Sequence, residues 1–194
     1  MDHMDMVIAG GTMVRSDRSF RANLAIKGGR IADIVADEML AEATQVADAQ
    51  AKIVMAGVID THVHMRSPDK EEREAAVTGG MAAAAGGVKT FLDMPNNVPP
   101  VNCASVLLAR RDTLSRQALV DFSLYSGDGE ANVGRIPELA GAGAVAPKTF
   151  LRPYSDRKDE FESLACTNDD APLDIFEAVA KTGLVQVVHP ERRQ

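Results

Sequence analysis

Three of the four histidines in this sequence stand at the ends of apolar runs. His62 and His64 follow the run V-I-D-T as an H-x-H pair, and His189 closes the run L-V-Q-V-V-H. Residues two apart in a strand point to the same face, so His62 and His64 can reach one metal ion. The pair alone could be two surface histidines, but a third histidine at the equivalent end of another strand favours a metal site. We assign no function to His3.

Lys148 is unusual because it lies in an otherwise apolar segment, A-V-A-P-K-T-F-L. A lysine buried there without a partner would be unfavourable. It could extend its ammonium group to the rim of the fold, or it could pair with a carboxylate. Alternatively, desolvation would keep the amine neutral, and a neutral amine can react with carbon dioxide to give a carbamate. A carbamate is an anionic group that can bridge two divalent cations.

A repeating pattern of strands and helices must position these side chains. From residue 56 onward no hairpin is evident, and this alternation is typical of βα units around a parallel sheet. Such units build either a doubly wound sheet or a (β/α)8 barrel, and no G-x-G-x-x-G follows a strand to favour a dinucleotide site. Residues 56–194 are therefore predicted to form an incomplete TIM-type barrel of about five of the eight βα units. The expected strands are 57–61, 89–94, 120–125, 144–151 and 184–189, and the expected helices are 71–85, 103–117, 133–140 and 173–181.

Residues 1–55 are predicted to form a separate, small β-sandwich-like module. Glycine pairs and charged turns separate short β-rich segments, and Gly28-Gly29-Arg30 is typical of a hairpin. Residues 39–51 are rich in alanine and acidic residues, which favours a loop or a weak helix. The expected strands are 6–9, 23–27, 30–35 and 52–55.

Composition and charge limit the class of protein. Apolar residues make up 45% of the chain and charged residues 25%, which is typical of a globular protein with a hydrophobic core. A net charge of −7 argues against nucleic acid or an anionic membrane as partner. We see neither a secretory signal nor an apolar run of the ~20 residues that a membrane helix needs. Cys103 and Cys166 have no metal-like spacing, so we expect two reduced thiols in a cytoplasmic protein.

Four motifs together resemble a known family, the amidohydrolase superfamily. The branch to which the chain is most similar contains the dihydroorotases, allantoinases and hydantoinases (dihydropyrimidinases). The resemblance covers essentially the whole chain but is not specific for a substrate. The motifs are G-V-I-D-T-H-V-H-M-R at 57–66, F-L-D-M-P-N-N at 91–97, K-T-F at 148–150 and V-V-H-P-E at 187–191.

The resemblance implies metal-dependent hydrolysis of the C–N bond of a cyclic amide or ureide. Its metal ligands would be His62, His64, Lys148 and His189, with the first two on the more buried metal. Two divalent ions, expected to be zinc, would be bridged by carbamylated Lys148. They would polarise the carbonyl and lower the pKa of the attacking water.

The resemblance also implies that Arg66 and Asn96 bind the substrate. A guanidinium at Arg66 suits a substrate carboxylate, which favours a ring such as dihydroorotate, with allantoin and hydantoin as the alternatives. Arg66 could equally form a loop salt bridge, and Asn96 could serve only its turn. Tyr154 lies near the place where hydantoinase-like members carry a substrate-positioning tyrosine.

The sequence departs from the family pattern near its end. Pro190-Glu191 follows His189, where the family usually has Ala-Glu. The family's later histidine ligand and its general-base aspartate have no counterpart, so we name no catalytic residue and expect this chain alone to be inactive. A full-length form is expected to be a homo-oligomer. A non-catalytic homologue that acts as a binding or assembly subunit is the alternative from another class, and it would bind no zinc.

Overall fold

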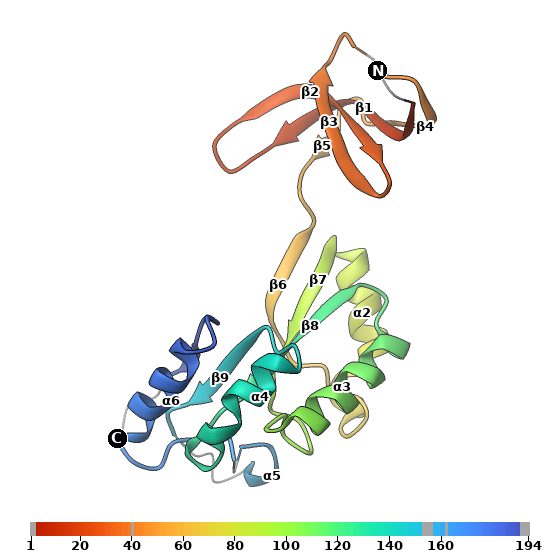
Figure 1. Ribbon diagram of the computed structural model, residues 1–194. Helices are drawn as coiled ribbons and strands as arrows, with labels where there is room; N and C mark the ends of the chain where they lie inside the picture. Colours follow the sequence, from red (N-terminus) through yellow and green to blue (C-terminus); the bar gives the residue numbers. More distant parts are fainter. Residues whose placement is uncertain (1–2, 40, 153–156, 162, 191–194) are drawn as a thin grey trace. The chain divides into compact units, whose positions relative to one another are not determined.

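The computed structural model describes residues 3–39, 41–152, 157–161 and 163–190 (Figure 1). The chain divides into two compact units, Met1–Ala56 and Gly57–Gln194. The first is a β module and the second a parallel sheet with helices, which confirms the predicted mixed α/β class. Within the described ranges, no helix is both long and apolar enough to span a membrane.

The first unit is a five-stranded sheet with a small core. Its order is β3-β2-β1-β4, and β5 also pairs with β1. The predicted hairpin is confirmed between β2 and β3: Lys27 pairs with Arg30, and Gly28 and Gly29 have φ angles of 60° and 70°. Both central residues thus have the positive φ that a tight two-residue hairpin requires. The strands are β1 (Met4–Val14), β2 (Ser19–Lys27), β3 (Arg30–Ala36), β4 (Ala43–Asp48) and β5 (Ile53–Val54).

The expectation of a loop or weak helix over 39–51 is wrong in its central part, which forms β4. This strand pairs in parallel with β1, with Met6 opposite Gln45 and Ile8 opposite Ala47. Hydrogen bonding to a neighbouring strand outweighs the helix preference of the alanines, which is only a fraction of a kcal/mol per residue (~0.5).

The second unit is a five-stranded sheet in which all neighbouring strands are parallel. Its order is β10-β9-β8-β7-β6. This is the predicted partial barrel. The strands are β6 (Val58–Val63), β7 (Val88–Asp93), β8 (Asp121–Gly127), β9 (Ala146–Phe150) and β10 (Val187–His189).

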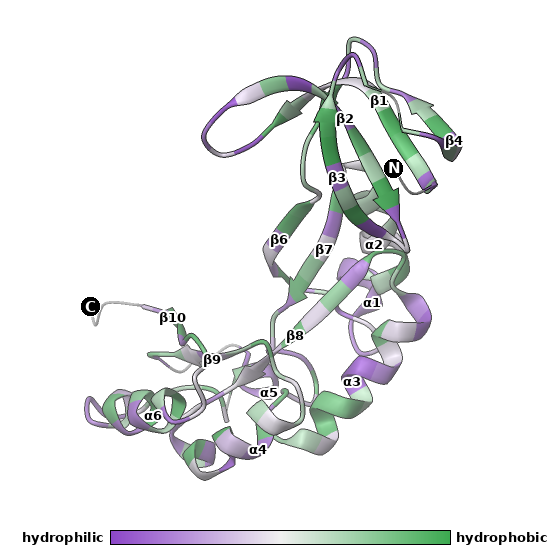
Figure 2. Ribbon diagram, turned by 45° about the horizontal axis from the view of Figure 1, so that its top comes forward, coloured by the Kyte–Doolittle hydropathy of each residue, from purple (hydrophilic) through white to green (hydrophobic). Residues whose placement is uncertain are grey.

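Helices connect these strands (Figure 2). Apolar side chains of the helices and strands form the core of the unit. Phe91 of β7 and Leu124 of β8 belong to the same buried cluster as Leu107 and Leu114 of α3 and Leu139 of α4. The helical segments are α1 (Glu71–Glu74), α2 (Ala76–Ala85), α3 (Ala104–Gln117), the 3-10 helix η1 (Glu130–Arg135), α4 (Ile136–Gly141), α5 (Lys158–Phe161) and α6 (Ala171–Ala180).

The single helix expected over 71–85 is wrong in one respect, because it breaks at Ala75 into α1 and α2. Ala75 is extended, with φ −75° and ψ 143°. Residues of the loop after β6 form hydrogen bonds with backbone groups at the break. The Ala76 N–H donates to the Ser67 hydroxyl oxygen at 2.9 Å, and the Arg66 N–H donates to the Glu74 carbonyl at 2.7 Å. These bonds fix the Arg66 loop against the two helices.

Candidate metal centre

Three of the four predicted metal ligands lie at or just beyond the carboxyl ends of parallel strands, and the fourth, Lys148, is the middle residue of a third strand. His62 is in β6 and His64 directly follows it, Lys148 is in β9, and His189 is the last residue of β10. In parallel βα sheets this edge carries the ligand-binding side chains. The sheet order places β9 and β10 side by side, with β8 and β7 between them and β6.

His62 and His64 lie next to one another and face open space. Their ring centroids are 5.2 Å apart, and both line a cleft of about 370 Å³ that Lys148 and His189 do not line. The Nδ1 atom of His64 is buried and has no hydrogen-bond partner of acceptable geometry within the described residues. A histidine that binds a metal has an unpaired ring nitrogen of this kind in a structure without the metal.

The surroundings of His62 and His64 lower the pKa of both side chains. Burial, followed by the positive charges of Lys148 and His189, lowers the pKa of His62. Burial, followed by the charge of Arg66, lowers the pKa of His64 to about 4. His64 is therefore a neutral imidazole near pH 7, the form that binds a metal.

Lys148 is buried, with 2% of its surface exposed. Its Nζ lies 5.4 Å from the centroid of the Phe150 ring, and no salt bridge to it is found in the part of the chain that the structure covers. Desolvation lowers the pKa of its amine. An ammonium group at the rim would be exposed, which the 2% exposure of Lys148 does not suit, and a salt-bridged lysine needs a carboxylate partner that the described residues do not provide.

No three histidine, cysteine, aspartate or glutamate side chains cluster as a metal site among the residues with described positions. A metal centre at this edge therefore needs the Lys148 side chain to supply ligand atoms between the β6 pair and His189. A carbamate on Lys148 would supply two oxygens. The residues present fit the implied metals on that condition.

The backbone between the paired histidines and Arg66 is held by a buried ion pair. Asp93 accepts a hydrogen bond from the Met65 N–H at 2.8 Å, and it accepts two from Arg110, at 2.9 and 2.8 Å. Arg110 also donates to the Met65 carbonyl. Met65 lies directly between His64 and Arg66, so this Asp93–Arg110 clamp fixes the direction in which both side chains leave the backbone.

Sequence reasoning missed both members of the clamp, although a signal for Arg110 was present. Leu107, Arg110 and Leu114 are the buried residues of α3, at the three- and four-residue spacing of one helix face. An arginine on an otherwise apolar face requires a buried partner. Asp93 lies within the quoted F-L-D-M-P-N-N motif.

Two further bonds secure the end of β6. The Tyr125 hydroxyl of β8 donates to the carbonyl of Thr61, the residue before His62, at 2.9 Å. The Met94 N–H donates to the Val63 carbonyl at 2.8 Å. The two histidines therefore stand on a strand end that is tied to both β7 and β8.

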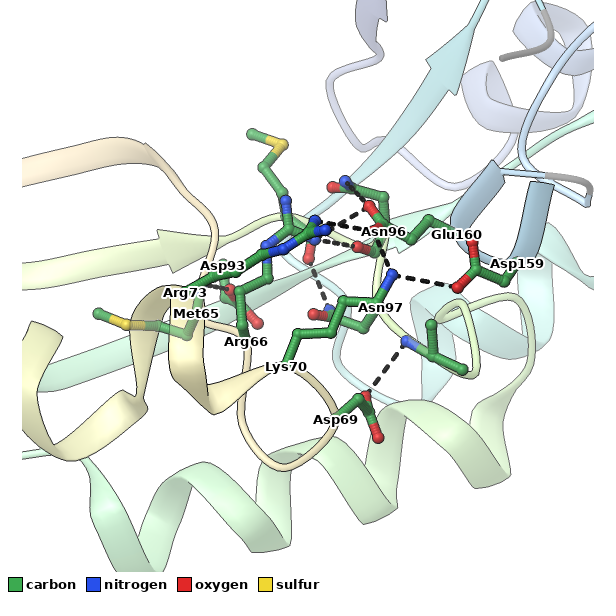
Figure 3. Close-up of polar contacts among 12 residues, drawn as sticks. Met65, Arg66, Asp69, Lys70, Arg73, Asp93, Asn96, Asn97, Asp159 and Glu160 are labelled. Carbon is green, nitrogen blue, oxygen red and sulfur yellow. Dashed lines mark hydrogen bonds and ion pairs between the residues drawn. The ribbon is translucent and has the colours of Figure 1, made fainter. Parts of the chain in front are cut away.

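The two predicted substrate-binding residues, Arg66 and Asn96, lie together and share a partner, Glu160 (Figure 3). Arg66 donates to Glu160 Oε2 at 3.2 Å and to the Asn96 carbonyl at 2.7 Å. Asn96 Nδ2 donates to the same Oε2 at 3.3 Å. Arg66 thus does form a salt bridge, the alternative that the sequence left open. Tyr154 lies outside the described residues.

Glu160 of α5 is a buried carboxylate, and sequence reasoning did not find it. It has no exposed side-chain surface, and Lys70 Nζ donates to its Oε1 at 2.6 Å. Burial would raise the pKa of Glu160, but the hydrogen bond from Lys70 and the charges of Arg66 and Lys70 outweigh burial and lower it. The glutamate is therefore ionised. Nothing in the charged segment K-D-E-F indicates its burial.

Comparison with known proteins assigns the family. Residues 53–145 match the sequence model of the Amidohydrolase family. An allantoinase of Desulfitobacterium hafniense (strain Y51) is 33% identical over 195 residues, 100% of this chain and 42% of that protein. An L-hydantoinase of Paenarthrobacter aurescens is 32% identical over 188 residues, 96% of this chain and 40% of that protein.

Solved structures agree with these relatives. The L-hydantoinase (dihydropyrimidinase) from Arthrobacter aurescens matches with a TM-score of 0.88 and 31% identity, over 97% of this chain and 41% of that chain. A D-hydantoinase matches with a TM-score of 0.78 and 25% identity, over 97% of this chain and 40% of that chain.

The chain therefore carries an amidohydrolase family domain. Relatives named allantoinase and L-hydantoinase match it along essentially its whole length. The predicted resemblance is confirmed at this level. The chain spans about 40% of the length of these relatives.

Proposed function

We propose that this chain belongs to a protein that, at the full length of its relatives, hydrolyses the amide C–N bond of a cyclic ureide of the allantoin or hydantoin class, at a centre of two zinc ions. His62, His64, Lys148 and His189 would hold the metals. The observation that carries the proposal is a buried Lys148, without a salt bridge in the described chain, beside strand ends that carry three histidines. The names of the relatives favour a ureide ring over dihydroorotate.

Lys148 would become a ligand by reaction with carbon dioxide. The neutral Nζ attacks the carbon of carbon dioxide, a C–N bond forms, and the nitrogen loses one proton to solvent. The product is a carbamate with two oxygens that can bind metal. The burial of Lys148 supports this step, because an amine removed from water favours its uncharged form.

Divalent ions held by these side chains would polarise the ring carbonyl and activate a water for attack on it. The chain's own residues orient the ligands. The Asp93–Arg110 clamp holds Met65 and thereby His64, and Tyr125 holds Thr61 and thereby His62.

Both cysteines are free thiols, which supports a reducing cytoplasmic location.

A metal-dependence assay tests the proposal. Because this chain alone is expected to be inactive, a form that spans the full length of the relatives is purified, stripped with a chelator and assayed for ring opening of hydantoin, allantoin and dihydroorotate, before and after zinc is restored. We expect one of the two ureides to be opened only with zinc, with a loss of at least about a hundredfold on stripping. A protein that binds no zinc and opens none of the rings would contradict the proposal and favour the non-catalytic binding subunit.

A further inference from the structure

The buried carboxylate of Glu160 accepts hydrogen bonds from Arg66 and Asn96, the two residues that the sequence predicts to bind substrate. Arg66 and Asn96 both donate to Oε2, and Lys70 donates to Oε1 at 2.6 Å, with Arg73 Nη1 3.7 Å from the same Oε1. Both oxygens therefore have cationic or amide donors (Figure 3). A guanidinium, an ammonium and an amide directed at two oxygens form a complete receptor for a carboxylate.

Burial distinguishes this contact from a surface salt bridge. The Arg66 side chain is 12% exposed and that of Glu160 is 0% exposed, whereas the neighbouring Asp159, which also binds Lys70, is 54% exposed. To admit another carboxylate, the site would have to expel Glu160 or bury a second negative charge beside it. Expulsion of Glu160 would cost the carboxylate its hydrogen bonds from Arg66, Asn96 and Lys70, and a second carboxylate beside it would place two negative charges in one buried site.

We propose that Glu160 is an internal carboxylate that fills the anion receptor formed by Arg66, Lys70 and Asn96. It makes the protein select rings that bear no carboxylate on this side. The inference deepens the proposed function, on which its statement about substrates rests. Rings that bear a carboxylate would be rejected because Glu160 already occupies the receptor and its negative charge repels a second carboxylate. Repulsion of this kind is a common source of specificity.

The receptor can be tested with acetate alone, without metal or turnover. Glu160→Ala removes the internal carboxylate and leaves its donors in place. Melting temperatures are compared in sodium acetate and in sodium chloride at equal ionic strength. We expect acetate to raise the melting temperature of Glu160→Ala by several degrees and to have no specific effect on the wild type, since a ligand stabilises only the state that binds it.

Two controls separate the receptor from general salt effects. Asp159→Ala removes the exposed carboxylate that shares Lys70, and it should respond to acetate like the wild type. Glu160→Gln keeps the space filled, and it should also lack the response. If Glu160→Ala shows no acetate effect, or if Asp159→Ala shows an equal one, the inference is wrong.

A measurement on the wild type covers the case in which Glu160→Ala does not fold. The side-chain amide of Asn96 is followed by NMR while acetate replaces chloride. We expect no specific shift, because Glu160 already occupies the receptor. A saturable shift would overturn the inference.

The substrate prediction is scored separately in the ring-opening assay. Preference for dihydroorotate over the ureides would overturn this inference and leave metal-dependent hydrolysis intact. Failure to bind zinc would overturn the proposed function, while the acetate results would still decide whether Glu160 fills the receptor.

Discussion

At the scale of single residues, burial and the presence of charged partners decide whether a titratable side chain is ionised. Lys148, Asp128 and Glu160 are all buried, but only Glu160 has cationic partners among the described contacts. Glu160 therefore stays ionised, while burial shifts Lys148 and Asp128 towards their neutral forms. For Lys148 this is the direction that the proposed carbamate requires, because a neutral amine reacts with carbon dioxide.

Asp128 gives a prediction about pH. It follows β8, and burial, only partly offset by the Ser126 hydroxyl, raises its pKa to about 7 from 3.8. Between these values the folded state keeps a proton that the unfolded state has lost. The free energy of unfolding should therefore fall as pH rises from about 4 to about 7, by up to roughly 1.4 kcal/mol per pH unit, and then level off.

Urea denaturation between pH 5 and 8 checks this dependence. Asp128→Asn should remove most of the slope, because an amide does not titrate. Asp121→Asn, at the exposed start of the same strand, should keep the slope of the wild type. Equal slopes for Asp128→Asn and the wild type would show that another group is responsible.

At the scale of elements, loops after the strands are held by buried polar contacts rather than by apolar packing alone. The loop after β6 is fixed to β7 and α3 through the Asp93–Arg110 clamp on Met65. The same loop reaches α5 through the bond of Arg66 to Glu160. Positions at the candidate centre therefore depend on contacts between elements that are distant in sequence.

Arg110→Met tests the clamp. It leaves the buried Asp93 carboxyl, whose pKa burial already raises to about 6, without its partner, so that this group must stay charged or take up a proton. We expect a loss of about 3–5 kcal/mol in the free energy of unfolding. Asp93→Asn in the same protein should restore part of that loss, because no buried charge then remains. Arg111→Met, at the exposed next position of α3, should change stability by less than about 0.5 kcal/mol. Additive losses at positions 93 and 110 would contradict a coupled pair.

At the scale of the whole molecule, the sequence predicts the order of elements well where periodicity is strong. The five parallel strands and the helices between them follow from apolar runs and turn residues, and the β2–β3 hairpin follows from Gly28-Gly29. Prediction from the sequence fails at β4, which forms by pairing with β1, and at Ala75, where a hydrogen bond to Ser67 accompanies the helix break. Local preference cannot predict contacts of this kind.

The same limit applies to the candidate site. The sequence alone shows the residue types of the predicted metal ligands and their positions in or after apolar runs. It therefore sufficed to predict His62, His64, Lys148 and His189 as metal ligands. The partner of Arg66 could not, because Glu160 lies 94 residues away in a segment that resembles an ordinary charged loop. Sequence can thus nominate groups for chemistry, while only the fold reveals which charges are already neutralised.

Zinc titration of the metal-free purified protein shows whether β6, β9 and β10 contribute to one metal centre. If β6, β9 and β10 contribute to one centre, a form at the full length of the relatives and its His3→Asn variant should each bind two zinc ions per chain. Lys148→Met and His62→Asn should each bind fewer, because each removes a ligand. A wild type that binds no zinc, or a Lys148→Met variant that binds as much as the wild type, would contradict the account.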